Sequence, residues 1–129
     1  MINIMPLGRM GNNLLQNAGA SIISENTGLK ANYIHIEGSD RLGIQYHKAH
    51  RCIEGPAVSI NDSQALVLLT EEQNIDYPLE LNCLFQEKHF LLKYYEKIRN
   101  HFKIRGKVTR NDLFVHARIG TKEPFWDKL

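Results

Sequence analysis

The chain has few of the features that would place it in a specialised class of proteins. Its 129 residues include only two cysteines, Cys52 and Cys83, which lie too far apart for a Cys-x-x-Cys motif. Two buried thiols explain them more simply than a disulfide, and a reducing, cytoplasmic setting is the default. No apolar run approaches the ~20 residues of a transmembrane helix. Residues 1–6 are too short to form a signal peptide.

Positive and negative charges nearly balance, with 16 lysines and arginines against 14 aspartates and glutamates. The formal net charge is +2, too small by itself to indicate a nucleic-acid or membrane partner. The sequence contains no Asp-x-Asp pair that could hold a divalent ion between phosphates, and no internal repeat. With 43% apolar and 23% charged residues, the composition is that of an ordinary soluble domain. A chain of this length buries about two-thirds of its unfolded surface, so a real core is expected.

The first third of the chain predicts a strand, a helix and a second strand. Residues 2–5 form a short apolar strand that ends at a proline. A helix then follows, with Asn12 as its N-cap and Gly28 in the position of a C-cap glycine. Residues 33–36 alternate between apolar and polar side chains and predict the second strand.

The rest of the sequence continues the alternation of strands and helices. Residues 38–80 are harder to interpret, because their two apolar patches could be short strands or part of a helix. Residues 81–85 predict a strand, residues 87–102 a long amphipathic helix, and residues 113–115 a buried strand. This pattern predicts an α/β fold: a Rossmann-like, mainly parallel sheet with flanking helices.

A glycine-containing loop joins the first strand to the first helix. In Gly8-Arg9-Met10-Gly11-Asn12, the glycines allow a tight turn and let a ligand approach the backbone N–H groups at the helix start. The spacing is neither that of a dinucleotide-binding loop nor that of a P-loop. A purely structural turn is one interpretation. Arg9 favours the other, because a cation beside the loop suits an anionic or polyhydroxyl ligand.

A second candidate motif, His116-Ala117-Arg118-Ile119-Gly120-Thr121, follows the apolar residues 113–115. An arginine just past the carboxyl end of a buried strand lies where α/β folds bind ligands. The Arg118 guanidinium could hold phosphate oxygens through two parallel hydrogen bonds, which lysine cannot reproduce. His116 could donate to a ribose, phosphate or sugar oxygen, and Gly120 would allow close approach. A surface arginine and a hydrogen-bonded core histidine are the simpler interpretation.

Three segments together resemble one enzyme family, the alpha-1,2-fucosyltransferases (glycosyltransferase family eleven). Its opening signature, Gly-Gly/Arg-Leu-Gly-Asn-Gln-Leu/Met-Phe-Gln-Tyr-Ala, is matched at Gly8, Arg9, Gly11, Asn12, Leu14, Gln16 and Ala18. Its donor-site motif, His-x-Arg-Arg/Leu-Gly-Asp, is matched at His116, Arg118 and Gly120, with Thr121 in place of the aspartate. Between them, Phe85 and Gln86 keep two residues of the family's Gly-Tyr-Phe-Gln.

The resemblance implies a two-domain GT-B transferase that moves fucose from GDP-fucose to a sugar hydroxyl of a glycan. Transfer would invert the anomeric carbon and need neither a cofactor nor a metal. Arg118 would be the catalytic residue, since it would stabilise charge on the leaving diphosphate. His116 and Gly120 would help it bind the donor. The substrate loop would consist of Gly8, Arg9, Gly11 and Asn12.

The same resemblance implies a division of the chain. Residues 1–110 would be the N-terminal, acceptor-side α/β domain, and residues 111–129 would begin a truncated donor-binding domain. The missing C-terminal domain would be a covalent or separate partner, and we expect the chain alone to be inactive. No transmembrane segment and no nucleic-acid partner are expected.

Two other functions remain open at this point. One is a non-catalytic, Rossmann-like binding module. The other is a nucleic-acid-binding domain, because residues 97–110 contain six basic residues and no acidic one. Positive charge at a helix end followed by a solvated loop explains that basic run more simply.

Overall fold

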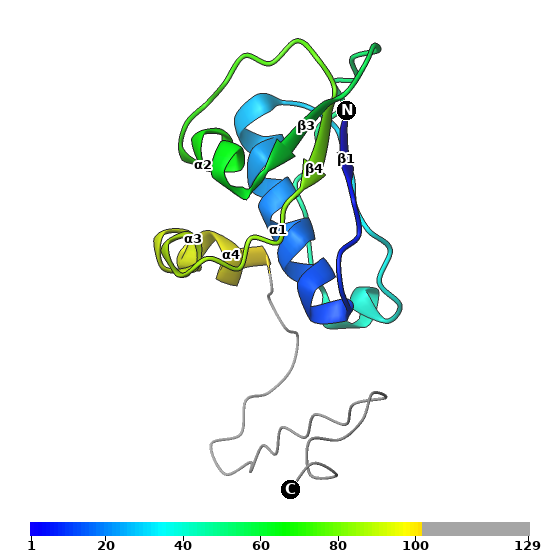
Figure 1. Ribbon diagram of the computed structural model, residues 1–129. Helices are drawn as coiled ribbons and strands as arrows, with labels where there is room; N and C mark the ends of the chain where they lie inside the picture. The colour runs from blue at the N-terminus through cyan, green and yellow to red at the C-terminus, as the bar shows by residue number, and fades with distance from the viewer. Residues whose placement is uncertain (102–129) are drawn as a thin grey trace, which may run out of the picture.

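The protein is seen here in a computed structural model, which describes residues 1–101 (Figure 1). Its elements, in chain order, are β1 (Ile2–Ile4), α1 (Met10–Thr27), β2 (Ala31–Asn32), the 3-10 helix η1 (Ser39–Leu42), β3 (Val58–Asn61), α2 (Asp62–Thr70), β4 (Leu79–Asn82), α3 (Lys88–Lys93) and α4 (Tyr95–His101). The strand predicted at residues 113–115 and the predicted domain boundary after residue 110 lie outside the described residues.

The four strands form one parallel sheet in the order β2-β1-β4-β3. Register is set at the start of the strands, where Ile2 pairs with both Ala31 and Leu79, and Leu79 pairs with Val58. Helices pack against this sheet, which confirms the predicted α/β, Rossmann-like fold. None of the helices within residues 1–101 is both long and apolar enough to cross a membrane.

The two faces of the sheet differ in chemistry. Ile2, Ile4, Ile60, Leu79 and Leu81 are buried and join one core with apolar residues of α1 and α2. The opposite face carries polar side chains: Asn3, Asn32, Ser59, Glu80 and Asn82. Hydrogen bonds cross between neighbouring strands on that face, from Asn32 Nδ2 to Asn3 Oδ1 (2.7 Å) and from Asn82 Nδ2 to Ser59 Oγ (2.7 Å). Parallel sheets usually bury both faces, so this polar outer face is unusual.

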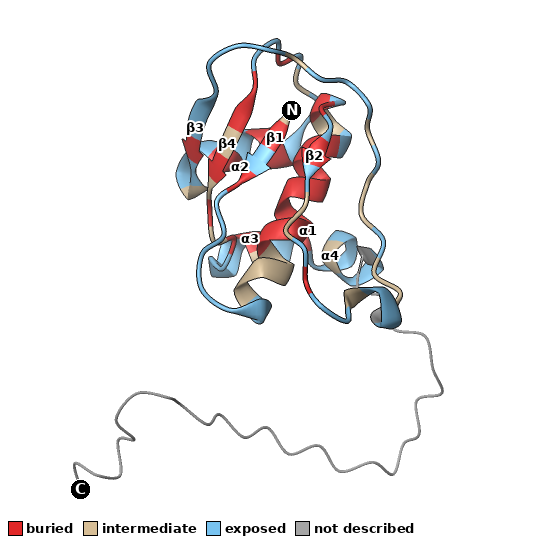
Figure 2. Cartoon of the chain, turned by 90° about the vertical axis from the view of Figure 1, so that its right-hand side faces the viewer, coloured by how far each residue is buried: buried red, intermediate tan, exposed pale blue. Residues whose placement is uncertain are grey.

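Helix α1 crosses the inner face of the sheet and is buried along most of its length (Figure 2). It ends as predicted, because Gly28 takes a left-handed conformation (φ 71°) and its N–H donates to the Ser24 carbonyl (2.9 Å). Its predicted start was wrong: the helix begins at Met10 with Arg9 as N-cap, and Asn12 already lies in the first turn. Several of its buried residues are polar, namely Gln16, Asn17, Ser21, Ser24 and Thr27.

The second strand is shorter and earlier than predicted. Only Ala31–Asn32 pairs with β1, and residues 33–36 form no strand. The backbone of Ile34 bonds instead to one side chain of α1: its N–H donates to Asn17 Oδ1 (2.8 Å) and its carbonyl accepts from Asn17 Nδ2 (2.9 Å). An amide side chain thus takes the place of a neighbouring strand, which the alternating pattern of residues 33–36 could not reveal.

The bounds after β3 also differ from the predicted ones. Strand β4 covers Leu79–Asn82 rather than residues 81–85. The predicted helix over residues 87–102 is interrupted, because Tyr94 leaves helical values (φ −105°, ψ 10°) between α3 and α4. The Phe90 ring lies 5.3 Å from that of Phe85 and 5.2 Å from that of Tyr94, so all three rings stay in the core across the break.

Both cysteines are free thiols, but only one is buried as predicted. Cys83 is fully buried and donates its S–H to the Ile60 carbonyl (3.3 Å), whereas Cys52 is exposed. The prediction for Cys52 was therefore wrong, because residues 43–57 belong to a long surface connection.

Candidate functional site

The glycine loop lies where its motif predicted, at the carboxyl end of β1 and the start of α1. Gly8 has a positive φ of 76°, and a β-carbon there would come within 2.0 Å of Asn12 Nδ2. Gly8 is therefore required both for its backbone angle and for the space that Asn12 fills. Gly11 is different, because no other atom lies within 4 Å of the position its β-carbon would occupy.

The start of α1 is exposed and lacks side-chain capping. Arg9 is the N-cap, and its side chain makes no capping hydrogen bond. The N–H groups of the first helical turn have no intrahelical acceptors and carry the positive end of the helix dipole. Nearby, the buried Asn13 Oδ1 accepts no hydrogen bond from the part of the chain that the structure describes. This corner can therefore offer hydrogen-bond donors to an oxygen-rich ligand, whereas the Asn13 oxygen is buried away from it.

Gln16, one turn further along α1, forms hydrogen bonds to the residues that follow β1 and β4 at the same edge of the sheet. Its Nε2 donates to the carbonyls of Met5 (2.8 Å) and Cys83 (2.9 Å), and its Oε1 accepts from the Leu7 N–H (3.0 Å). The side chain is fully buried. It fills the gap between the carboxyl ends of the two central strands, so a ligand at this edge must lie outside Gln16, over the start of α1.

A hydrogen bond joins the glycine loop to the segment that follows β4. Gln86 Nε2 donates to Asn12 Oδ1, although the two residues are 74 positions apart in the sequence. Phe85, the neighbour of Gln86, packs its ring on α1 at Gly19, where a β-carbon would lie 2.6 Å from the ring. The sequence alone did not predict this contact between two of the three segments that resemble the fucosyltransferase family.

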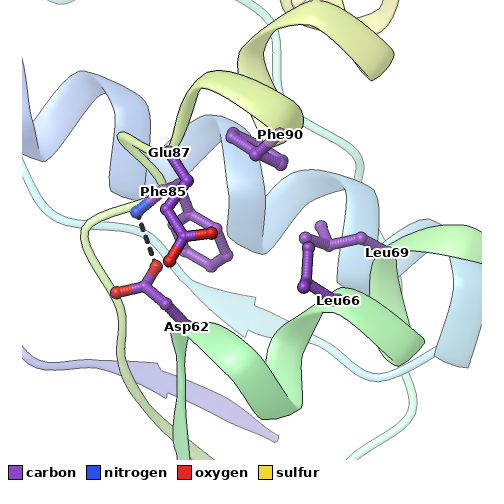
Figure 3. A pocket seen from close by; sticks show the side chains of 6 residues that line it. All are labelled: Asp62, Leu66, Leu69, Phe85, Glu87 and Phe90. Atoms are coloured by element: carbon purple, nitrogen blue, oxygen red, sulfur yellow. Dashed lines mark hydrogen bonds between the residues drawn. The ribbon is translucent and has the colours of Figure 1, made fainter.

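The turn after β4 is held by Asp62, the first residue of α2. Its carboxylate accepts from the N–H groups of Phe85 (2.9 Å) and Leu84 (3.2 Å). Figure 3 shows the bond to Phe85. Phe85 has a left-handed backbone (φ 54°), which is costly for a bulky residue and needs such support. Asp62 was not among the residues that the sequence predicted for the site. The start of α2 was nevertheless signalled by Asn61 and Gln64, which form a capping box.

A small pocket beside this turn is too narrow for a substrate. It is lined by Asp62, Leu66, Leu69, Phe85, Glu87 and Phe90 (Figure 3). Its volume of about 10 Å³ is no more than one water molecule needs. No group of three or more metal-ligating side chains occurs within residues 1–101.

Comparisons with known proteins do not assign the chain to a family. Neither the protein-family models, nor the curated proteins, nor the solved structures contain a significant match to it.

The structure therefore brings together one part of the predicted site. Gly8, Arg9, Gly11 and Asn12 share one exposed corner of the sheet edge. The predicted donor-site residues, His116, Arg118 and Gly120, lie outside the described residues. So does most of the basic run, of which Lys97 and Arg99 are exposed on α4.

Proposed function

We propose that this chain forms the acceptor-side α/β part of a fucosyltransferase that transfers fucose from GDP-fucose to a sugar hydroxyl of a glycan. The observation that supports it best is the hydrogen bond between Asn12 and Gln86. The two residues belong to separate segments with the family's sequence pattern, and they meet at the carboxyl edge of a parallel sheet, where such folds bind ligands. β1 and β4 are neighbours in the sheet, and this pairing brings the two segments together.

The glycine corner supplies what a hydroxyl-rich substrate needs. Among the described residues, Gly11 leaves open space over the first turn of α1, and the first N–H groups of that turn, which have no acceptor within the helix, are donors. Arg9 adds an exposed cation to the same corner. The oxygens of a sugar or a diphosphate are the acceptors that suit this arrangement.

In this proposal Arg118 acts on the leaving group. Charge builds on the diphosphate oxygens as the bond to fucose breaks, and a bidentate guanidinium stabilises it more than a point charge does. His116 and Gly120 would shape the same donor loop. The reaction would be inverting and independent of divalent metal ions.

The test uses the complete product of the gene that encodes this chain, assayed with GDP-fucose and a panel of galactosides. We expect release of GDP and formation of a fucosylated product, both unchanged by EDTA. Arg118→Lys should lower the rate at least about tenfold, because the bidentate contact is lost. Arg110→Lys, the same exchange outside the motif, is the control and should leave the rate unchanged.

Two results would count against the proposal. If no galactoside is fucosylated while GDP or a sugar still binds, the chain is the non-catalytic binding module instead. If Arg118→Lys and wild type are equally active, Arg118 has no part in catalysis. Salt-sensitive binding of RNA or DNA without any sugar binding would favour the nucleic-acid alternative.

A further inference from the structure

A second, larger hollow lies on the β2 side of the molecule. Its volume is about 690 Å³, within the range of sites that hold small ligands. The side chains that matter for its chemistry are Tyr33, Asp40, Gln45, Tyr46, His47 and Lys48. They come from the segment after β2 and from the connection through η1, at the same end of the sheet as the start of α1 (Figure 1). We call this site the tyrosine hollow.

Buried polar residues of α1 hold both walls of the tyrosine hollow in place. Asn17 bonds both backbone groups of Ile34, the neighbour of Tyr33 on one wall, and its Nδ2 also donates to Tyr46 Oη (3.5 Å) on the other. Ser21 Oγ accepts from the His47 N–H (2.8 Å). Since Asn17 and Ser21 are buried in the body of the protein, the walls are fixed before any ligand arrives.

The floor of the hollow is aromatic. The rings of Tyr33 and Tyr46 stack with their centroids 4.6 Å apart and an interplanar angle of 24°. The Tyr33 hydroxyl donates to the His47 carbonyl (2.6 Å), which fixes that ring. Burial raises the pKa of both tyrosines, so both stay neutral at physiological pH. Each ring is only partly buried.

The rim carries one charge of each sign together with neutral polar groups. Asp40 and Lys48 are exposed and opposite in charge, and Gln45 offers both a donor and an acceptor. A phosphate would meet the Asp40 carboxylate, and Lys48 is the one permanently charged cation among the lining residues. A wholly apolar ligand would displace water from the charged groups of Asp40 and Lys48 and offer no hydrogen bond in return. A neutral ring with hydroxyls on its edge and C–H groups on one face satisfies both the rim and the aromatic floor.

From this chemistry we infer that the tyrosine hollow binds the terminal sugar of the acceptor glycan, with its apolar face on the tyrosine pair and its hydroxyls on Asp40, Gln45 and Lys48. The choice of an acceptor sugar among neutral ligands rests on the proposed function. The hollow is separate from the glycine corner, which would then face the reacting hydroxyl and the donor.

The experiment is a titration of the ¹⁵N-labelled full chain with methyl β-galactoside, followed by amide chemical shifts. We expect weak, saturable binding with the largest shifts at residues 33–48. Tyr46→Leu, which removes the ring but keeps apolar volume, should weaken binding at least about fivefold, and so should Asp40→Asn. Tyr46→Phe keeps the ring and should bind nearly as wild type does. Asp76→Asn, the same charge change at an exposed position outside the hollow, is the matched control.

The outcomes separate this inference from the proposed function. Shifts confined to residues 8–13, or equal affinities for wild type, Tyr46→Leu and Asp40→Asn, would refute the tyrosine hollow while leaving fucosyl transfer intact. Sugar binding that depends on Tyr46 and Asp40, in a gene product that transfers no fucose, would support the hollow and refute the transferase. Absence of any galactoside binding, with fucose transfer to a galactoside still observed, would also refute the hollow.

Discussion

Two glycines of α1 differ in the space around them: Gly19 is tightly packed and Gly11 is open. A β-carbon at Gly19 would lie 2.6 Å from the Phe85 ring in the core, whereas one at Gly11 meets nothing within 4 Å. Gly19→Ala should therefore cost about 1–3 kcal/mol of unfolding free energy through overpacking. Gly11→Ala should be neutral or stabilise by up to about 1 kcal/mol, because alanine favours the helix.

Urea unfolding of the two variants beside wild type measures this difference. Because both substitutions add one methyl group to the same helix, Gly11→Ala is an internal control for helix propensity. A Gly19→Ala variant as stable as wild type would show that the Phe85 ring does not pack on α1 as described. If Gly11→Ala is stable but slows fucose transfer by the complete gene product, Gly11 is kept as glycine for access to the helix start.

The Cys83 thiol should make the protein less stable in alkaline solution. Burial, with a smaller contribution from the nearby Asp62 carboxylate, raises the pKa of Cys83 from 9.0 to about 12. Above pH 9 the unfolded chain releases this proton while the folded chain keeps it, so stability falls as pH rises toward 12. Between about pH 8 and about pH 10, the unfolding free energy of wild type should fall by about 1 kcal/mol more than that of Cys83→Ala.

The measurement is urea unfolding over that pH range. The control is Cys52→Ala, which removes the exposed thiol and should keep the wild-type slope. Tyr33, Tyr46 and Tyr94 also have raised pKa values through burial, so every variant should lose further stability above pH 10. Identical slopes for wild type and Cys83→Ala would mean that the thiol is not buried.

At the scale of elements, α2 and the turn after β4 depend on one carboxylate. Asp62 Oδ1 and Oδ2 accept from the N–H groups of Phe85 and Leu84, and this supports the left-handed Phe85. Asp62→Ala should lower the unfolding free energy by about 1.5–3 kcal/mol, the usual cost of losing hydrogen bonds to a charged group. Asp62→Asn keeps one acceptor oxygen, so its unfolding free energy should fall by less than that of Asp62→Ala. Asp76→Ala, at an exposed loop position, is the control and should unfold like wild type in chemical denaturation.

The elements that the sequence predicted well are those with one clear apolar face. β1 was predicted because the apolar Ile2 and Ile4 alternate with the polar Asn3. The end of α1 was predicted because a glycine such as Gly28 commonly ends a helix in the left-handed conformation. The sequence left the segment of β3 open between a strand and a helix, because the outer face of the sheet is polar and the strand is at an edge. Val58-Ser59-Ile60-Asn61 therefore has one buried residue, Ile60, and little pattern. The predicted fold class was nevertheless correct, because it depends on the order of strands and helices and not on their bounds.

The site was less predictable than the fold, for a physical reason. Gly8 has a visible backbone role, so its loop could be placed from the sequence. Gln16 and Asn17 have no such signal. Polar residues in a helix usually face solvent, yet these two are buried, and their partners come from three other segments of the chain. Contacts between distant segments, such as Asn12 with Gln86, depend on the tertiary structure alone.

At the scale of the whole molecule, polar side chains of α1 bond to parts of the chain outside the sheet. Asn17 holds Ile34 in the segment after β2, and Asn26 Nδ2 donates to the Leu68 carbonyl of α2 (2.9 Å). Neither residue belongs to the strand pairs at the centre of the sheet. Each asparagine should therefore stabilise a different part of the protein, and parts held by few contacts open without global unfolding.

Hydrogen exchange of amide protons can distinguish these two connections. Asn17→Leu removes both bonds to Ile34, so residues 33–47 should exchange at least about tenfold faster, while Ile2–Ile4 and Leu79–Asn82 remain the slowest-exchanging segments. Asn26→Leu, the same exchange on the same helix, should instead speed exchange near the end of α2. Because residues 33–47 form the walls of the tyrosine hollow, Asn17→Leu should also weaken galactoside binding and Asn26→Leu should not. Equal acceleration across the whole sheet in Asn17→Leu would contradict this, since it would mean that the segment after β2 and the sheet open only as one unit.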